Sequence, residues 1–270
     1  MNQLLVLTDF SAAADNALAY AAQLAQPLRA GLLLLHVRRT SLLDPEALTG
    51  KYPARTEAEA RALLQQQAAH WQQQGIACTG QVAAGDVTEE FVAAARAHGV
   101  LLAVASKCDT EELPDELVNS TVLRLLRHTP CPLLVVPESY RQHALPLHWL
   151  VALDEQPAQL GALATAAQPL LEAGHPLVQG VQVIGEGQAT SPAHPANLAT
   201  ALGAEAPMQV LPGSDVALVL TKRARQQLGS WLVLWARSRS RLSNLFHRSR
   251  TAAVVLHSPV PVLVLPEAAA

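Results

Sequence analysis

Five arginines lie close together near the end of the chain and could bind an anionic group. They are Arg237, Arg239, Arg241, Arg248 and Arg250. The stretch 222–250 that contains them holds no acidic residue, so its positive charge is not offset locally. Arginine can grip a phosphate through two parallel hydrogen bonds, which makes this stretch a candidate phosphate site. A solvated loop and an interdomain contact are the alternative interpretations.

Five carboxylates gather in the first half of the chain. They are Asp109, Glu111, Glu112, Asp115 and Glu116. Like charge repels an anionic ligand, so this stretch disfavours phosphate. The two halves of the chain therefore offer opposite chemistry to a ligand.

Other side chains give little support for catalysis or metal binding. The sequence contains none of the patterns GxxxxGK[ST], GxSxG and HExxH. Its ten histidines are scattered without ligand spacing, and its three cysteines form no CxxC pair. We expect reduced thiols and no metal site, and we favour a protein that is not an enzyme.

A repeat organises the chain. Arg127–Pro137 recurs as Leu256–Pro266, in each case a His-Thr/Ser-Pro-x-Pro motif with an aliphatic run, and Leu4–Asp9 resembles Leu150–Asp154. The offset is 129 residues for the closing motif and 145 for the opening one, so the second copy is 16 residues shorter. Because solenoid units span only ~20–50 residues, the repeat predicts two homologous domains, 1–141 and 147–270.

Short aliphatic runs alternate with Ala-rich helical stretches within each copy. The predicted strands of the first copy are 3–8, 31–37, 77–83, 100–105 and 132–136, and its helices are 12–26, 55–74, 87–98 and 119–128. Ser11 and Thr88 are the expected N-caps, and Gly99 is expected just past a helix end. The predicted strands of the second copy are 149–153, 177–184, 207–211, 231–235 and 261–265, with a shortened helix near 196–203. Each half should form an α/β domain with a five-stranded parallel sheet and helices on both faces.

Composition agrees with two folded domains. Of the 270 residues, 50% are apolar and 15% charged, which excludes a disordered chain. No apolar run approaches the ~18 residues of a membrane span, and the opening segment lacks a basic region. We expect a cytoplasmic protein without membrane contact.

Ligands of parallel α/β sheets bind at the carboxyl ends of the strands, beside the point where strand order reverses. Asp9 and Asp154 follow the first strand of each copy. The turns at 85–86 and 213–214 and the loops after the fourth strands complete the set of positions at this edge. These positions are the candidate site.

The first half resembles a universal stress protein domain nearly from end to end. The segments that carry this resemblance are Val6–Ser11, Leu33–Val37, Ala84–Val87 and Val122–Val136. The second half is similar through Leu150–Asp154, Gly213 and His257–Pro266. The resemblance implies two Rossmann-like domains of the adenine nucleotide alpha hydrolase-like type, packed as the subunits of family dimers pack. It also leaves homo-oligomers through such packing open.

Nucleotide-binding members of that family carry a loop with the pattern G-x2-G-x9-G followed by Ser or Thr. Its glycine positions fall here on Ser106, Asp109 and Asn119, followed by Ser120 and Thr121, and in the second copy on Trp235, Ser238 and Arg248, followed by Ser249. All six glycines are absent. Such a loop needs a bare backbone so that N–H groups can approach phosphate oxygens, and side chains block that approach.

The resemblance implies candidate ligand-binding residues by position. In the first half they are Asp9, Val37, Ser106, Asp109, Asn119, Ser120 and Thr121. In the second half they are Asp154, Arg237, Ser238, Arg239, Arg241, Arg248 and Ser249. As alternatives, the aspartates after the first strands could only end strands or cap helices, and Ser120, Thr121 and Ser249 could be helix caps. A structural hydrogen bond suits His128 and His257 better than catalysis does.

The sequence favours a tandem universal stress protein-like protein that binds a protein partner or a small anionic ligand, needs no cofactor and has lost ordinary ATP binding. The alternative is a nucleotide-binding or slowly ATP-hydrolysing member that holds phosphate through its second-half arginines. A nucleic-acid contact has poor support, because Trp231 and Trp235 fit a strand and leave few aromatic side chains for base stacking.

Overall fold

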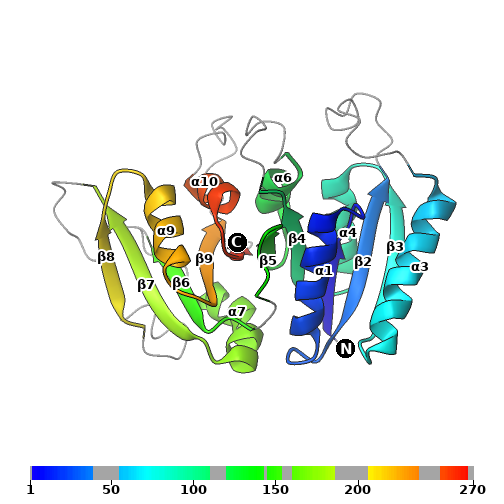
Figure 1. Ribbon diagram of the computed structural model, residues 1–270, viewed down its shortest axis with the longest axis horizontal. Coiled ribbons are helices and arrows are strands. Elements are labelled where there is room, and N and C mark those ends of the chain that lie inside the picture. Colours follow the sequence, from blue (N-terminus) through cyan, green and yellow to red (C-terminus); the bar gives the residue numbers. More distant parts are fainter. Residues whose placement is uncertain are drawn as a thin grey trace. The chain divides into compact units, whose positions relative to one another are not determined.

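The computed structural model describes residues 2–38, 55–109, 120–142, 145–153, 160–185, 206–236 and 250–266. The chain divides into two compact units, Met1–His143 and Ala144–Ala270. Within each unit, the strands pair with one another in parallel (Figure 1).

The first unit contains five parallel strands. They are β1 (Asn2–Leu7), β2 (Ala30–Arg38), β3 (Cys78–Ala84), β4 (Val100–Lys107) and β5 (Leu133–Pro137). Their order is β3-β2-β1-β4-β5, and each neighbouring pair is parallel. All five predicted strands are confirmed, with ends that differ by one or two residues.

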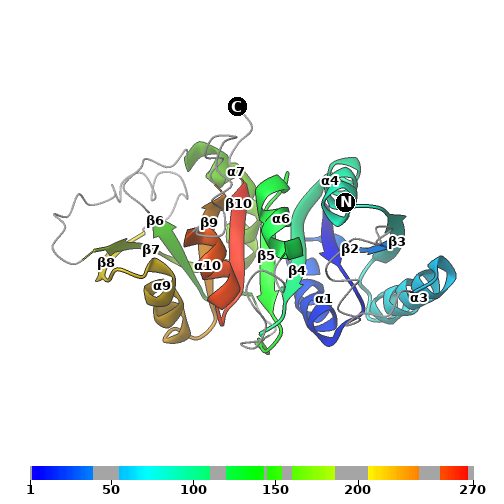
Figure 2. The same cartoon turned by 90° about the horizontal axis from the view of Figure 1, so that it is seen from above.

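Helices cover both faces of this sheet. They are α1 (Ala12–Ala25), α3 (Glu57–Gln73), α4 (Val87–Ala97) and α6 (Ser120–His128). Figure 2 shows α1 and α3 on one face and α4 and α6 on the other. The alanines of α1 that face the sheet are buried, and their small side chains let the helix lie close to the strands.

The helix caps of the first unit can be compared with the cap residues predicted from the sequence. The prediction for Ser11 is confirmed, since its Oγ accepts a hydrogen bond from the N–H of Ala14 at 3.2 Å. Gly99 follows α4 with a φ of 55°, a left-handed conformation that glycine adopts readily. The prediction for Thr88 is wrong: Asp86 caps α4 by accepting from the N–H groups of Thr88 and Glu89. Thr88 instead lies buried in the first turn.

The second unit repeats the fold of the first. Its strands are β6 (His148–Leu153), β7 (Leu177–Ile184), β8 (Met208–Pro212), β9 (Ser230–Ala236) and β10 (Val262–Pro266). The order β10-β9-β6-β7-β8 matches the first unit strand for strand when read from β8, and all neighbours are parallel. The five predicted strands are again confirmed.

The helices described in the second unit are α7 (Leu160–Gly174), α9 (Val216–Arg225) and α10 (Arg250–His257). Figure 2 shows α7 on one face of the sheet and α9 and α10 on the other. The predicted helix near 196–203 lies outside the described residues.

The core of each unit lies on both faces of its sheet. Leu4 and Leu5 are successive residues of β1 that point to opposite faces, and both are fully buried. In the second unit Trp149 of β6 and Trp231 of β9 are register partners, and their rings stack with centroids 6.2 Å apart. Two-sided burial explains why these strands have no polar alternation in sequence.

Candidate functional site

The switch point of the first unit lies between β1 and β4, because β1 pairs with β2 on one side and with β4 on the other. The connections that follow β1 and β4 lead to opposite sides of this point, which leaves room for a ligand at the carboxyl edge of the sheet. Asp9 follows β1, while Ser106 and Lys107 end β4. Asp9 and Ser106 therefore both lie at the carboxyl edge of the sheet.

Asp9 stabilises the turn between β1 and α1. Its Oδ1 accepts a hydrogen bond from the N–H of Ser11 at 2.9 Å, and Thr8 Oγ1 accepts from the N–H of Phe10 at 3.1 Å. These bonds support a φ of 62° at Phe10, an uncommon value for a bulky residue. Asp9 therefore stabilises the turn that follows β1, whereas the N-cap of α1 is Ser11.

Negative charge extends from Asp9 along α1. Burial raises the pKa of Asp15, and the charge of Asp9 acts in the same direction, although Gln67 donates to the Asp15 carboxylate. That bond joins Gln67 Nε2 to Asp15 Oδ1 at 2.8 Å. Two neighbouring carboxylates at this edge disfavour a polyanionic ligand.

An aromatic and cationic cluster lies beside this turn. The centroids of the Phe10 and His36 rings lie 4.6 Å apart. The Arg55 guanidinium lies over the Phe10 ring, 5.0 Å from the centroid of that ring. Arg55 Nη1 also donates to the main-chain oxygen of Asp9 at 3.3 Å. Sequence analysis missed Phe10 and Arg55, which are 45 residues apart in the chain.

His36 is held in one orientation. Its Nδ1 lies 2.8 Å from the Thr8 carbonyl oxygen, which can only accept, so we assign the proton to Nδ1. Burial lowers the pKa of His36, and the charges of Arg55 and Arg38 add to that effect against the Thr8 bond and Asp9. A neutral ring therefore packs against Phe10.

Val37, a candidate by resemblance, is buried in β2 and lies in register with Ala83 of β3. Ser106 is half-buried and in register with Val136. Both lie in the sheet at the expected edge.

Asp109 occupies the second glycine position of the family pattern and is anchored by its own chain. Its Oδ1 lies 3.5 Å from Lys107 Nζ, and its Oδ2 accepts from the N–H of Ser139 at 2.6 Å. The Lys107 carbonyl accepts from the N–H of Glu138 at 2.9 Å, which closes the same connection. The start of the loop after β4 is thereby tied to the turn after β5.

Lys107 has an unusual environment for a lysine. Its side chain is 4% exposed, compared with 31% for Asp109. Burial lowers the pKa of Lys107, and the Asp109 carboxylate opposes that shift. Sequence analysis did not assign Lys107 to the site, and only its place next to the glycine positions could have indicated it.

The first turn of α6 carries Ser120 and the half-buried Thr121. Farther along α6, Arg124 forms an ion pair with Asp86, the N-cap of α4. The Arg124 carbonyl lies 2.9 Å from His128 Nδ1, which confirms the structural hydrogen bond expected for His128. The Arg124–Asp86 pair joins α6 to α4.

We expect Asp86→Ala to lower the free energy of unfolding by about 1–2 kcal/mol, because α4 loses its N-cap. Urea denaturation measures the loss. Asp86→Asn is the control, since asparagine caps equally well and removes only the charge. A cost for Asp86→Asn as large as that for Asp86→Ala would contradict a capping role.

The same carboxyl predicts a pH dependence. Burial alone would raise the pKa of Asp86, but the bonds from Arg124 and from two N–H groups hold it below its usual value. A lowered pKa in the folded state stabilises the fold above about pH 4, and this stabilisation is lost as the pH falls through the folded pKa.

The remaining candidates lie outside the described residues. They are Asn119, Asp154, Arg237, Ser238, Arg239, Arg241, Arg248 and Ser249. Within the described ranges, no group of three or more His, Cys, Asp or Glu side chains could hold a metal ion. The same part of the chain contains no helix long and apolar enough to cross a membrane.

Two α/β units with the same parallel strand order, each with a switch point at its carboxyl edge, define a tandem Rossmann-like protein. The model of the Universal stress protein family matches residues 1–137. The chain belongs to this family, and its second unit repeats the fold of the matched one.

Solved structures share the fold of this chain. A universal stress protein from Archaeoglobus fulgidus matches with a TM-score of 0.75 and 18% identity, over 98% of this chain and 96% of that one. A functionally unknown protein from Pseudomonas aeruginosa matches with a TM-score of 0.67 and 16% identity, over 99% and 93%. A universal stress family protein from Burkholderia pseudomallei is 30% identical over 50% of this chain and 96% of that one, with a TM-score of 0.38. No curated protein sequence matches significantly.

Proposed function

We propose that this tandem universal stress protein acts in the cytoplasm by binding a protein partner or small ligand without catalysis, and that its first unit does not bind ATP. The observation that carries the proposal is the Asp109 carboxylate, anchored between Lys107 Nζ and the N–H of Ser139. It introduces a side chain and a negative charge where a nucleotide-binding loop presents bare backbone.

Two physical reasons support the loss of ATP binding in this unit. Two described donors beside this loop, Lys107 Nζ and the Ser139 N–H, already bind the chain's own carboxylate. The turn that carries Ser139 is itself fixed, because Asn16 Nδ2 donates to the carbonyls of Pro137 and Tyr140. A phosphate at this point would have to displace a charged group that the chain already binds, so the described start of this loop does not fit a triphosphate.

A thermal-shift titration of the full chain with ATP and magnesium tests the proposal. A binder gains about 2.7 kcal/mol when the ligand is at a hundred times its Kd, whereas we expect no shift. Asp109→Gly is the informative variant: it removes the carboxylate and restores a glycine, and any gain of ATP binding should appear there first. Asp215→Gly, at a helix cap of the second unit, is the matched control.

If the first unit does not bind ATP, a thermal shift of the wild-type protein with ATP and magnesium must come from the second unit. Replacing Arg237, Arg239 and Arg241 by serine should then abolish it, which would establish the alternative of a nucleotide-binding protein that uses second-half arginines. A shift that survives this triple substitution would contradict the proposal for the first unit.

A further inference from the structure

The outer edge of β3 carries main-chain groups that face away from the sheet. β3 is a terminal strand and pairs with β2. The Ala77 carbonyl accepts a hydrogen bond from the N–H of Leu32, and the Gly85 N–H donates to the Arg38 carbonyl. The main-chain N–H and C=O groups of odd-numbered residues in this strand therefore point toward β2. Because strand residues alternate, the N–H and C=O groups of Gly80 and Val82 point outward.

Two features with which proteins often protect a terminal strand, a charged residue and a proline, are missing from the seven residues of β3, Cys78–Ala84. The corresponding strand of the second unit, β8, has five residues, follows Pro207 and ends at Pro212. The residues of β8 therefore protect its edge, whereas those of β3 do not.

A side-chain amide already occupies one position along the edge. Gln72 Nε2 of α3 donates to the main-chain oxygen of Cys78 at 2.7 Å. This amide stands where the N–H of an added strand would stand. The outward groups of Gly80 and Val82 continue the same row.

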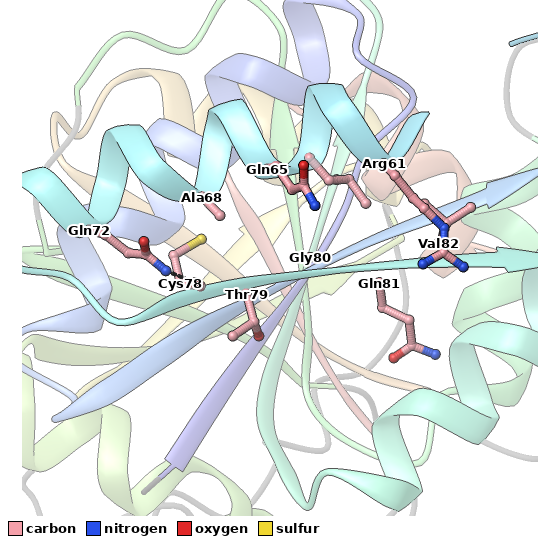
Figure 3. Close-up of a pocket in the computed structure, with 10 residues that line it drawn as sticks. Arg61, Gln65, Ala68, Gln72, Cys78, Thr79, Gly80, Gln81 and Val82 are labelled. Carbon is pink, nitrogen blue, oxygen red and sulfur yellow. Dashed lines mark hydrogen bonds between the residues drawn. The ribbon is translucent and has the colours of Figure 1, made fainter. Parts of the chain in front are cut away.

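A cavity of about 580 Å³ runs along this row, between α3 and β3 (Figure 3). Its polar lining includes Arg61, Gln65 and Gln72 from α3. At Gly80, which is exposed, a Cβ would lie 2.8 Å from the Cβ of Leu64. Glycine is thus required for α3 to lie this close, and it leaves the strand's backbone accessible.

We propose that this groove binds an extended, polar peptide segment of a partner protein, which adds a strand to the edge of β3. The peptide's main chain pairs with Gly80 and Val82. Gln65 and the guanidinium of Arg61, which also pairs with Glu57, meet its polar side chains. Strand addition of this kind draws affinity from main-chain hydrogen bonds and specificity from the adjoining side chains. This inference is independent of the proposed loss of ATP binding.

Fluorescence anisotropy with a labelled peptide, Thr-Val-Thr-Asp-Thr-Val-Thr, tests the proposal on the full chain. Val82→Pro removes one outward N–H without breaking a bond to β2, since proline is tolerated where the N–H faces outward. We expect affinity to fall about tenfold or more. Val82→Ala keeps the N–H and should bind like the wild type. Equal binding by Val82→Pro, or no binding by the wild type, would overturn the proposal.

Methylated peptides test the pairing on the unchanged protein, which covers the case that Val82→Pro does not fold. Only one edge of an added strand pairs with β3. Two peptides are compared, one methylated on the amide nitrogens of its odd residues and the other on those of its even residues. One of the two should lose binding, and the other should retain it. Equal binding of both peptides would overturn the proposal. Sedimentation tests the other occupant: a wild-type dimer that Val82→Pro dissociates would assign the edge to a second copy instead.

Discussion

Raising the pH from about 9 to about 11 should lower the free energy of unfolding by about 2 kcal/mol for each of two buried thiols. Burial raises the pKa of Cys78 from 9.0 to about 11. Burial likewise raises that of Cys131 to about 11, against weaker effects of Thr129 and Ala103. The unfolded thiols ionise first, so this stabilisation is complete below pH 9.0 and is lost as the pH rises through the folded pKa.

Urea denaturation under reducing conditions across this pH range measures the effect. The double variant Cys78→Ala/Cys131→Ala should flatten the alkaline decline, even if it lowers stability at neutral pH. Cys108→Ala is the matched control, since that thiol is only partly buried and its removal should leave the decline in place. A double variant with the wild-type slope would show that these thiols do not cause it.

Trp231→Ala should cost about 3–5 kcal/mol of unfolding free energy in the second unit. Trp231 is fully buried and stacks on Trp149, with ring centroids 6.2 Å apart and planes 12° from parallel. Truncation leaves a large cavity on the face of the sheet from which both tryptophans project, and it removes the stacking contact.

Far-UV circular dichroism in urea is the appropriate measurement, because it does not depend on the tryptophan that is removed. Trp71→Ala is the matched control: this tryptophan of α3 is partly exposed and should cost much less. Comparable losses for the two variants would contradict a dominant role for the stacked pair.

Local sequence patterns were sufficient for the strands because burial on both faces makes each strand an aliphatic run. The run Leu32–Leu35 shows this for β2. The N-cap of α4 was missed for the opposite reason. Asp86 and Thr88 are both suitable cap residues two positions apart, and only the backbone path decides which side chain reaches the free N–H groups.

The candidate site was predictable in part. Asp9 and Asp109 could be placed at the carboxyl edge from strand order and from the family pattern alone. Their partners could not, since Arg55 lies 46 residues from Asp9, and Ser139 lies 30 residues from Asp109. No spacing rule connects residues at such separations; strand register does.

By itself, the sequence determined the duplication, the strand positions, the absence of the phosphate-loop glycines and the opposite charge of the two equivalent loops. These properties depend only on the type and order of the residues, and they are independent of the conformation of the chain. The tertiary structure alone decided that Asp109 is anchored by Lys107 and Ser139, that Phe10 contacts His36 and Arg55, and that β3 is a terminal strand beside α3. Each depends on which distant segments the sheet makes neighbours, because hydrogen bonds and ring contacts act only over a few ångströms.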